Sequence, residues 1–312
     1  MLNAGRALQR IASGWASAAV QRGTSLSKAY GLISRFSEDI DITVFRGDLG
    51  QAASVGELEA LSGKKRRARL DAIKLACRNY IQDVLLRQLG NIAETAMAES
   101  GIAPDLARLA IDGDDPDGQS LLFWYPTVSA ERDPYVRRAI KVESGAKSAF
   151  DSNEPVTIKP YIADDVPAIP LSVTGVTTVV AERSFWDKVI IVHGTRHWFE
   201  ARGVLRQQGQ RVSRHYYDLH RMMQSPVAQR ALVDRELAGD CARHARMFFG
   251  SPDLGLDAAC QGSFTLTPTE GMLNDLQRDY GRMADMIVGE IPSFEKVIES
   301  IRELEARARA DR

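Results

Sequence analysis

The hydrophobic positions change period within the stretch "GTSLSKAYGLISRFSEDIDITVF", residues 23–45. Three apolar residues first recur at the helical spacing i, i+4, i+7: Leu26, Tyr30 and Ile33. This spacing predicts a helix, and Thr24 or Ser25 can serve as its N-cap. The period then becomes two, and apolar and polar residues alternate: Ile40, Ile42 and Val44 with Asp39, Asp41 and Thr43. We therefore expect a short helix followed by a strand with both aspartates on one face.

The apolar pattern divides the rest of the chain into a mixed front half and a helical back half. Residues 63–89 carry an apolar stripe and predict a long amphipathic helix. Further strands are predicted at 120–128, 137–145 and 156–162, the first two as neighbours. The first and last helices of the back half have apolar stripes: Phe185, Trp186, Val189 and Ile190, then Phe294, Val297, Ile298, Ile301 and Leu304.

This division predicts an α+β fold in two domains. We expect a mixed sheet with flanking helices in residues 1–180 and a mostly helical C-terminal domain in residues 181–312. Residues 1–22 lack an acid and suit a short amphipathic helix better than a cleaved transit peptide. The stretch "DGDDPDG", residues 112–118, predicts a turn and not a calcium loop, because Pro116 interrupts it.

Composition narrows the class of protein. The 312 residues are 44% hydrophobic and 26% charged, with a net charge of −1 and no apolar run long enough to span a membrane. Such a chain has no general basic field for nucleic acid, so a polyanion would need local patches. The three cysteines are far apart and suit a reducing cytoplasm. His193 and His197 have helical spacing without an HExxH glutamate, which favours a surface or packing role over zinc.

Asp39 and Asp41 are the main candidates for chemistry. On one strand face their Cα atoms lie about 6.5 to 7 Å apart, so both carboxylates can converge on one ion. Without a cation, two buried carboxylates would repel each other. Oxygen ligands suit Mg²⁺, and the start of the preceding helix offers N–H groups to phosphate. This pattern indicates a two-metal nucleotidyl-transfer site, with Glu143 on a neighbouring strand as the candidate third ligand.

Five stretches in order carry a family resemblance: "GTSLSKAYGLISRFSEDIDI", "LLFWYPT", "YVRRAIKVESGAKSAFDSNEPVTIKPYI", "VVAERSFWDKVIIVHG" and "SRHYYDLHRM". They resemble the AbiEii/MenT nucleotidyltransferase toxins of type IV toxin–antitoxin systems, within the DNA-polymerase-β-like nucleotidyltransferase superfamily. The resemblance covers most of residues 22–225 and implies a nucleotidyltransferase-like fold.

The resemblance also implies roles for particular residues. Asp39 and Asp41 would hold the metal, Lys188 would reach the nucleotide phosphates, and Asp218 would be the acid of the last motif. The nucleotide-binding positions that it implies are Gly23, Thr24, Ser25, Lys28 and Lys188. From the residues alone, Lys188 could instead pair with Asp187 or Glu182 on its own helix, and Asp218 with Arg214 one turn earlier.

The function implied is a Mg²⁺-dependent toxin of phage defence that moves a nucleoside monophosphate from an NTP to an RNA. The acceptor would be the 3′ end of tRNA, translation would stop, and an antitoxin encoded nearby would be the partner. One alternative is a small-molecule nucleotidyltransferase of the aminoglycoside-modifying kind. Another is a decayed member that only binds nucleotide or antitoxin, since Arg22 stands where the family has a glycine and the segment before it is short.

Overall fold

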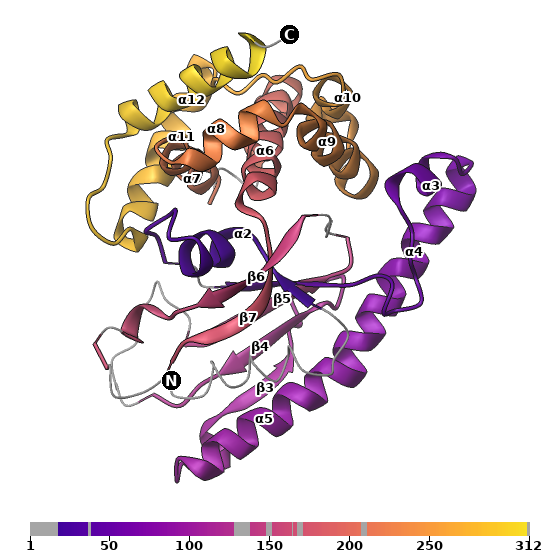
Figure 1. The fold of residues 1–312 in the computed structure, drawn as a ribbon, viewed down its shortest axis with the longest axis vertical. Helices are drawn as coiled ribbons and strands as arrows, with labels where there is room; N and C mark the ends of the chain where they lie inside the picture. The colour runs from indigo at the N-terminus through magenta and orange to yellow at the C-terminus, as the bar shows by residue number, and fades with distance from the viewer. Residues whose placement is uncertain are drawn as a thin grey trace. The chain divides into compact units, whose positions relative to one another are not determined.

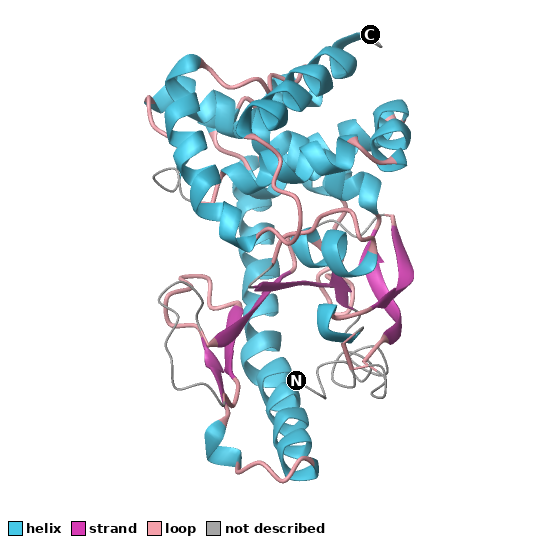
Figure 2. Cartoon of the chain, turned by 90° about the vertical axis from the view of Figure 1, so that its left-hand side faces the viewer, coloured by secondary structure: helices cyan, strands magenta, loops and turns pink. Residues whose placement is uncertain are grey.

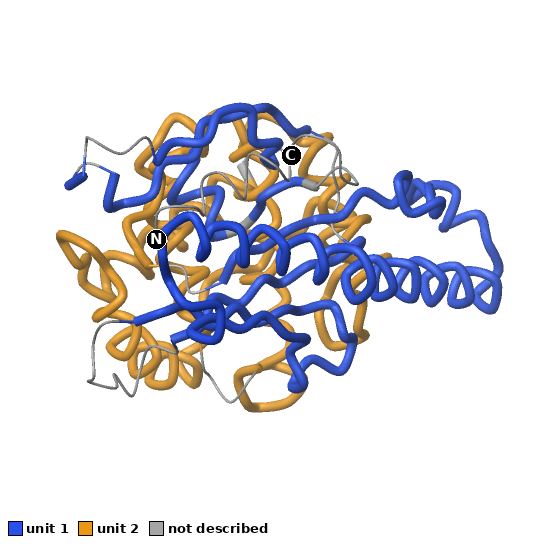
Figure 3. Tube along the Cα trace, turned by 90° about the horizontal axis from the view of Figure 1, so that it is seen from below, with its two compact units in different colours: residues 1–29, 37–179 blue, residues 30–36, 180–312 orange. Residues whose placement is uncertain are grey.

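The structure is a computed structural model, and its chain divides into two compact units (Figure 3). The first unit comprises residues 1–29 and 37–179, and the second comprises residues 30–36 and 180–312. The structure describes residues 18–36, 39–127, 138–147, 152–163, 165–166, 171–206 and 211–310. That residues 1–180 and 181–312 fold as separate domains stays a prediction.

The first unit is built on a seven-stranded mixed sheet (Figure 1). Its strands are β1 (Ala18–Val20), β2 (Asp39–Val44), β3 (Arg108–Ile111), β4 (Ser120–Trp124), β5 (Ala139–Gly145), β6 (Asn153–Ile158) and β7 (Val173–Val179). They lie in the order β3-β4-β5-β2-β1-β7-β6, with β2 parallel to β5 and β1 parallel to β7. Strands lie near each predicted position, and β4 and β5 are antiparallel neighbours as expected, but the bounds differ. β4 ends at Trp124, before the predicted residue 128, and β6 ends at Ile158, with a 3₁₀ turn where the strand was predicted to continue.

The beginning of the described chain differs from the prediction. The helix expected over residues 1–22 is wrong at Ala18–Val20, which form β1, and residues 1–17 lie outside the described part. Val20 pairs with Ile42 of β2 and with Thr178 of β7, so this short apolar segment completes the sheet. The acid-free composition on which the helix was predicted carries no information about these long-range pairings.

The first helix is also shorter than its apolar spacing predicts. It consists of α2 (Arg22–Thr24) and a π-helical turn, η1 (Ser25–Ala29). Leu26 and Ile33 are both buried, but Ile33 lies beyond the helix. Gly31 has φ +61°, a left-handed conformation that ends the helical path. Because the helix starts at Arg22, neither Thr24 nor Ser25 is its N-cap.

One long helical segment runs past the sheet (Figure 1). It comprises α4 (Gly63–Asn79), a π-helical turn η2 (Tyr80–Leu85) and α5 (Leu86–Glu99), and is longer than the predicted 63–89. α3 (Val55–Glu59), which has a capping box from Ser54 and Glu57, precedes it. Figure 3 shows α3 and the first turns of α4 extending beyond the remainder of the first unit.

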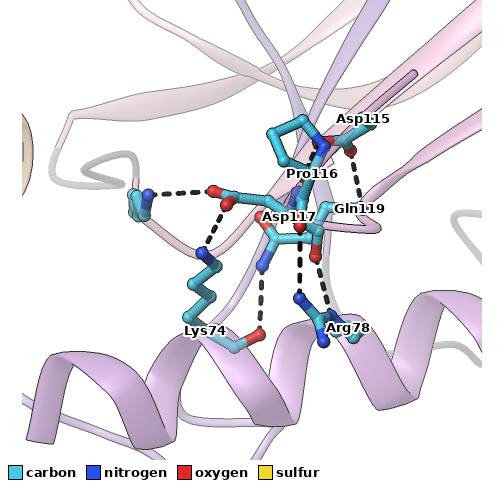
Figure 4. A network of polar contacts seen from close by, with 7 residues as sticks. Lys74, Arg78, Asp115, Pro116, Asp117 and Gln119 are labelled. Atoms are coloured by element: carbon cyan, nitrogen blue, oxygen red, sulfur yellow. Dashed lines mark hydrogen bonds and ion pairs between the residues drawn. The ribbon is translucent and has the colours of Figure 1, made fainter. Parts of the chain in front are cut away.

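The turn at residues 112–118 fastens this long helix to the sheet (Figure 4). Arg78 Nε donates to the Asp117 carbonyl at 2.8 Å, and Lys74 forms an ion pair with the Asp117 carboxylate. Gln119 Nε2 donates to the Lys74 carbonyl at 3.0 Å. Asp115 accepts from the backbone N–H groups of Asp117 and Gln119, as in an Asx turn. The predicted turn is confirmed. Its contacts with α4 hold the residues that lead into β4.

The second unit is helical (Figure 2). Its helices are α6 (Ala181–Arg202), α7 (Ser213–Met223), α8 (Pro226–Val233), α9 (Arg235–Phe249), α10 (Leu256–Cys260), α11 (Glu270–Met283) and α12 (Phe294–Ala310). Both predicted apolar stripes, on α6 and α12, are buried. His193 packs inside the unit, with Nε2 2.9 Å from the Gly255 carbonyl, as the packing interpretation predicts. No helix in the described part is long and apolar enough to cross a membrane.

The segment Tyr30–Phe36 leaves the first unit and belongs to the second. Arg35 forms an isolated antiparallel bridge with Ile287. The Phe36 N–H donates to the Met286 carbonyl and the Val288 N–H to the Ser34 carbonyl, both at 2.7 Å. The connection between the first helix and β2 is therefore held by the helical unit.

Candidate active site

The start of the first helix is bonded directly to the strand that carries the two aspartates. Thr24 Oγ1 donates to the Asp39 carbonyl at 2.8 Å, and the Gln21 N–H donates to the Asp41 carbonyl at 3.2 Å. Gly23 and Ser25 are buried beside them. The expected phosphate-binding residues and the expected metal ligands are thus neighbours. Arg22 begins α2, and its side chain lies outside what is described.

Four charged side chains gather on one face of the sheet: Asp39, Asp41, Lys141 and Glu143. We call this set the carboxylate face. In the parallel pairing of β2 with β5, Asp39 lies opposite Lys141 and Asp41 lies opposite Glu143. Residues paired in register point to the same side of a sheet, so Glu143 lies on the side of the two aspartates. That it binds a metal stays a prediction. Asp41 is buried, whereas the other three are only partly buried.

Lys141 lies two residues before Glu143, the expected third metal ligand, and contacts its carboxylate. Its Nζ lies 2.9 Å from Glu143 Oε1 and 3.3 Å from Asp112 Oδ2. Partial burial lowers the pKa of Lys141, but hydrogen bonds and attraction from the two carboxylates outweigh burial and raise it above its ordinary value. Lys141 is therefore a cation, and Glu143 is already engaged by it.

The two aspartates match the number of carboxylates with which a metal–nucleotide complex is commonly held. Over the described ranges, no three histidine, cysteine, aspartate or glutamate side chains are arranged to hold a metal ion. Mg²⁺ is commonly held by one or two carboxylates together with substrate phosphates and water. Asp39 and Asp41 provide that number of carboxylates, beside the helix start that would receive the phosphates. The donor set therefore fits magnesium through two aspartates.

Lys28, expected to bind nucleotide, is at the end of the π-helical turn and contacts an aromatic ring. Its Nζ lies 2.7 Å from the ring centroid of Tyr161, in the 3₁₀ turn η4 (Tyr161–Ala163). Burial lowers the pKa of Lys28 to about 8. Lys28 thus changes charge in a range where an ordinary lysine stays protonated.

Lys188 and Asp218 meet in the second unit, together with Arg35, and we call these three residues the buried charge cluster. Asp218 Oδ2 accepts from Lys188 Nζ at 2.6 Å. Arg35 binds the same carboxylate through Nε at 2.7 Å and Nη2 at 2.8 Å. Asp218 is 0% exposed and Lys188 4%. The sequence therefore predicted two members of one cluster and missed the third.

Burial and the charges of its own members act in opposite directions within the buried charge cluster. Burial raises the pKa of Asp218, but Arg35 and Lys188 more than reverse this and hold it well below its ordinary value. Burial lowers the pKa of Lys188, and Asp218 opposes that shift. The surface-charge alternative for Asp218 is wrong, since it is fully buried. Glu182 pairs with Arg230 at 2.6 Å, so it is not the partner of Lys188.

Comparison with known proteins places the chain in a family. The model of the family described as the nucleotidyl transferase AbiEii toxin of type IV toxin–antitoxin systems matches residues 7–302. Among solved structures, the nucleotidyltransferase toxin MenT4 from Mycobacterium tuberculosis H37Rv is 15% identical, with a TM-score of 0.38, over 97% of this chain and 89% of that chain. Comparison with curated proteins returns no match. The chain belongs to the AbiEii family of nucleotidyltransferase toxins of type IV toxin–antitoxin systems.

Proposed function

We propose that this protein is an active, Mg²⁺-dependent nucleotidyltransferase that transfers a nucleoside monophosphate from an NTP to an RNA hydroxyl. The acceptor is the 3′ end of tRNA, the enzyme works in the cytoplasm, and a cognate antitoxin controls it. The observation that supports this best is the 2.8 Å hydrogen bond from Thr24 to the Asp39 carbonyl. It joins the helix start that suits phosphate to the strand that suits the metal.

Each residue has a proposed task. Asp39 and Asp41 bind the metal, and the ion, when bound, offsets charge on the phosphates as pyrophosphate leaves. The backbone of Gly23, Thr24 and Ser25 binds the phosphates, with Lys28 at the end of the same turn. These groups act chiefly by positioning the reactants.

Lys188 and Asp218 have a proposed role in the same reaction. Lys188 offsets charge on the triphosphate, and Asp218 holds its ammonium while the nucleotide is absent. An ion pair of 2.6 Å inside a buried cluster must loosen before Lys188 contacts a phosphate. On this proposal, nucleotide binding replaces the Lys188–Asp218 ion pair with a contact between Lys188 and a phosphate.

Arginines of the second unit are proposed to guide the RNA backbone. Arg202 and Arg206 both lie near the ring of Trp198, at 5.4 and 5.2 Å from its centroid. Aromatic and guanidinium groups together suit single-stranded RNA ends. Lys64, Lys65 and Arg67, which are exposed at the start of α4, are a second candidate contact. RNA binding should then weaken steeply with added salt.

The test is transfer of label from each of the four α-radiolabelled NTPs to total tRNA. Wild-type protein should label tRNA with Mg²⁺ and lose activity in a chelator. Asp41→Asn should abolish labelling, whereas Asp71→Asn, which changes an exposed aspartate on α4, should not. Label that persists in Asp41→Asn would reject the proposed metal role.

The same assay, repeated with an aminoglycoside as the acceptor, separates the alternatives. Label on the aminoglycoside and none on RNA would support a small-molecule acceptor. Nucleotide binding without transfer to any acceptor would support a decayed enzyme, and recovery of transfer in Arg22→Gly would assign the loss to that position. A folded wild-type protein with neither binding nor transfer would overturn the proposal.

A further inference from the structure

Lys141 is the one cation among the four residues of the carboxylate face, and it lies on β5. It is opposite Asp39 of β2 on one side and opposite Leu122 of β4 on the other. Because Lys141 and Glu143 are two residues apart on β5, both point to the side of the sheet that carries the aspartates. A lysine at this place adds positive charge where magnesium and triphosphate are proposed to bind.

Two carboxylates hold the ammonium group of Lys141 in place. Glu143 Oε1 is 2.9 Å away and Asp112 Oδ2 is 3.3 Å away. Asp112 is itself fixed, since it is 4% exposed and its Oδ1 accepts from the Asp114 N–H at 3.1 Å. The lysine side chain is 30% exposed, so a ligand can reach it. An ammonium group has three N–H donors, and these two contacts leave one for a further acceptor.

The same contacts argue against metal binding by Glu143. A metal ion bound by Glu143 would compete with Lys141 for one carboxylate and would lie close to a like charge. Asp39 and Asp41 already supply two carboxylates, which can suffice for Mg²⁺ when phosphates complete its coordination. Glu143 is then available to orient Lys141.

We propose that Lys141 binds a phosphate group of the NTP and that Glu143 is a positioning residue for Lys141, not a metal ligand. This inference rests on the proposed function, because it assumes that a triphosphate binds at the carboxylate face. Before nucleotide binds, Lys141 opposes the arrival of a free metal ion. Once phosphate is present, the ammonium of Lys141 donates to a phosphate oxygen while Glu143 and Asp112 keep it in position.

The first experiment measures Mn²⁺ binding without nucleotide, by electron paramagnetic resonance. Asp41→Asn should weaken binding by about tenfold or more, since loss of a ligand should cost at least as much as loss of an outer-shell partner. Glu143→Gln should leave the affinity close to that of wild type, and Lys141→Met should increase it because a competing cation is gone. Lys147→Met, which removes a partly exposed lysine that pairs with Asp117, is the matched control and should change nothing.

The second experiment measures binding of inorganic tripolyphosphate with Mg²⁺ by calorimetry, which avoids choosing an NTP. Lys141→Met should weaken it by about tenfold, the effect of one charge-assisted hydrogen bond. Lys141→Arg should retain much of the affinity for tripolyphosphate. The affinity of Glu143→Gln should lie between those of Lys141→Met and Lys141→Arg. If Lys141→Met fails to fold with Asp112 unpaired, Lys141→Met/Asp112→Asn carries the same expectation.

Two results would overturn this inference. One is an equal loss of Mn²⁺ affinity in Glu143→Gln and Asp41→Asn, which would make Glu143 a metal ligand. The other is tripolyphosphate binding that is unchanged in Lys141→Met. Both readouts are binding measurements, so a protein that transfers nothing to RNA would refute the proposed acceptor without deciding the role of Lys141.

Discussion

The carboxylate face and the buried charge cluster both combine acids with cations, but they differ in the sequence separation of their members and in their exposure to solvent. The carboxylate face is assembled from adjacent strands in register, and its Lys141–Glu143 pair is about one third exposed, at 30% and 35%. The buried charge cluster joins residues 183 positions apart, Arg35 and Asp218, and its members are 0 to 5% exposed. Charges at the first are accessible to a ligand where they lie, whereas those at the second are buried and must separate before Lys188 can contact a phosphate. Substitutions should therefore act chiefly on ligand binding at the first and chiefly on stability at the second.

The largest effect on stability is expected from Asp218→Ala. This change leaves Arg35 and Lys188 buried without their shared carboxylate, and the free energy of unfolding should fall by about 3 to 5 kcal/mol. Urea denaturation measures it. The matched control is Asp240→Ala, which removes an exposed aspartate paired with Arg243 and should lower the free energy by less than about 1 kcal/mol. Equal losses in the two variants would mean that burial adds nothing to the cluster.

Asp39→Asn should have the opposite profile. The rate of nucleotidyl transfer should fall about a hundredfold or more, in line with loss of a group that stabilises the reacting charges. The free energy of unfolding should stay the same or rise, because one of two like charges on β2 is gone. Transfer assays and urea denaturation on the same preparation check both. A large loss of stability in Asp39→Asn would contradict the contrast between the two regions.

The carboxylate face could be predicted from sequence because its information is local. Alternation over six residues is enough to place Asp39 and Asp41 on one side of a strand, and the same rule on β5 joins Lys141 to Glu143. What the alternation did not indicate was the ion pair between them. The pattern indicated Glu143 as a candidate metal ligand, although Lys141 on the same face is a cation that can pair with it. The ion pair could have been expected, since opposite charges two residues apart on a strand are neighbours on one face.

The buried charge cluster could not be predicted from local pattern. Arg35 lies in "ISRFSEDID", where it looks like an ordinary polar residue of a loop, and its partner is 183 positions away. The family resemblance identified Lys188 and Asp218 separately, with no indication that they bind each other. The sequence did offer one signal. Asp218 lies between Tyr217 and Leu219, two large residues that the structure buries, and a buried carboxylate needs a partner of opposite charge.

Lys188→Met separates a nucleotide role from a structural one. Asp218 keeps its two bonds from Arg35 in this variant, so the free energy of unfolding should fall by only about 1 to 3 kcal/mol. If Lys188 also binds phosphate, the KM for the NTP should rise under conditions where the variant is folded. Arg35→Met breaks the same cluster without a proposed phosphate contact, so its KM should stay near that of wild type. An equal rise of KM in both variants would show that Lys188 acts only through the cluster.

The smallest effect is expected at Lys28, through pH. Its pKa of about 8 means that the ammonium is lost between pH 7 and 9, so the KM for the NTP should rise over this range, by no more than about tenfold. Stability should improve with pH, although binding of the NTP weakens. The pKa is about 8 in the folded protein and near 10.5 in the unfolded chain, so between these values the unfolded chain binds more protons and stability rises with pH.

Lys28→Arg distinguishes this titration from other pH effects. A guanidinium stays charged throughout the range, so the rise of KM and the contribution to stability should both disappear in the variant. The KM is measured for one NTP at fixed Mg²⁺ from pH 7 to 9, and stability by urea denaturation over the same range and above. A wild-type KM that is flat with pH, or one that rises equally in Lys28→Arg, would remove Lys28 from the nucleotide-binding residues. In that case its contact with Tyr161 would be a packing contact of the first unit, and phosphate binding would rest on the start of the first helix and on Lys141.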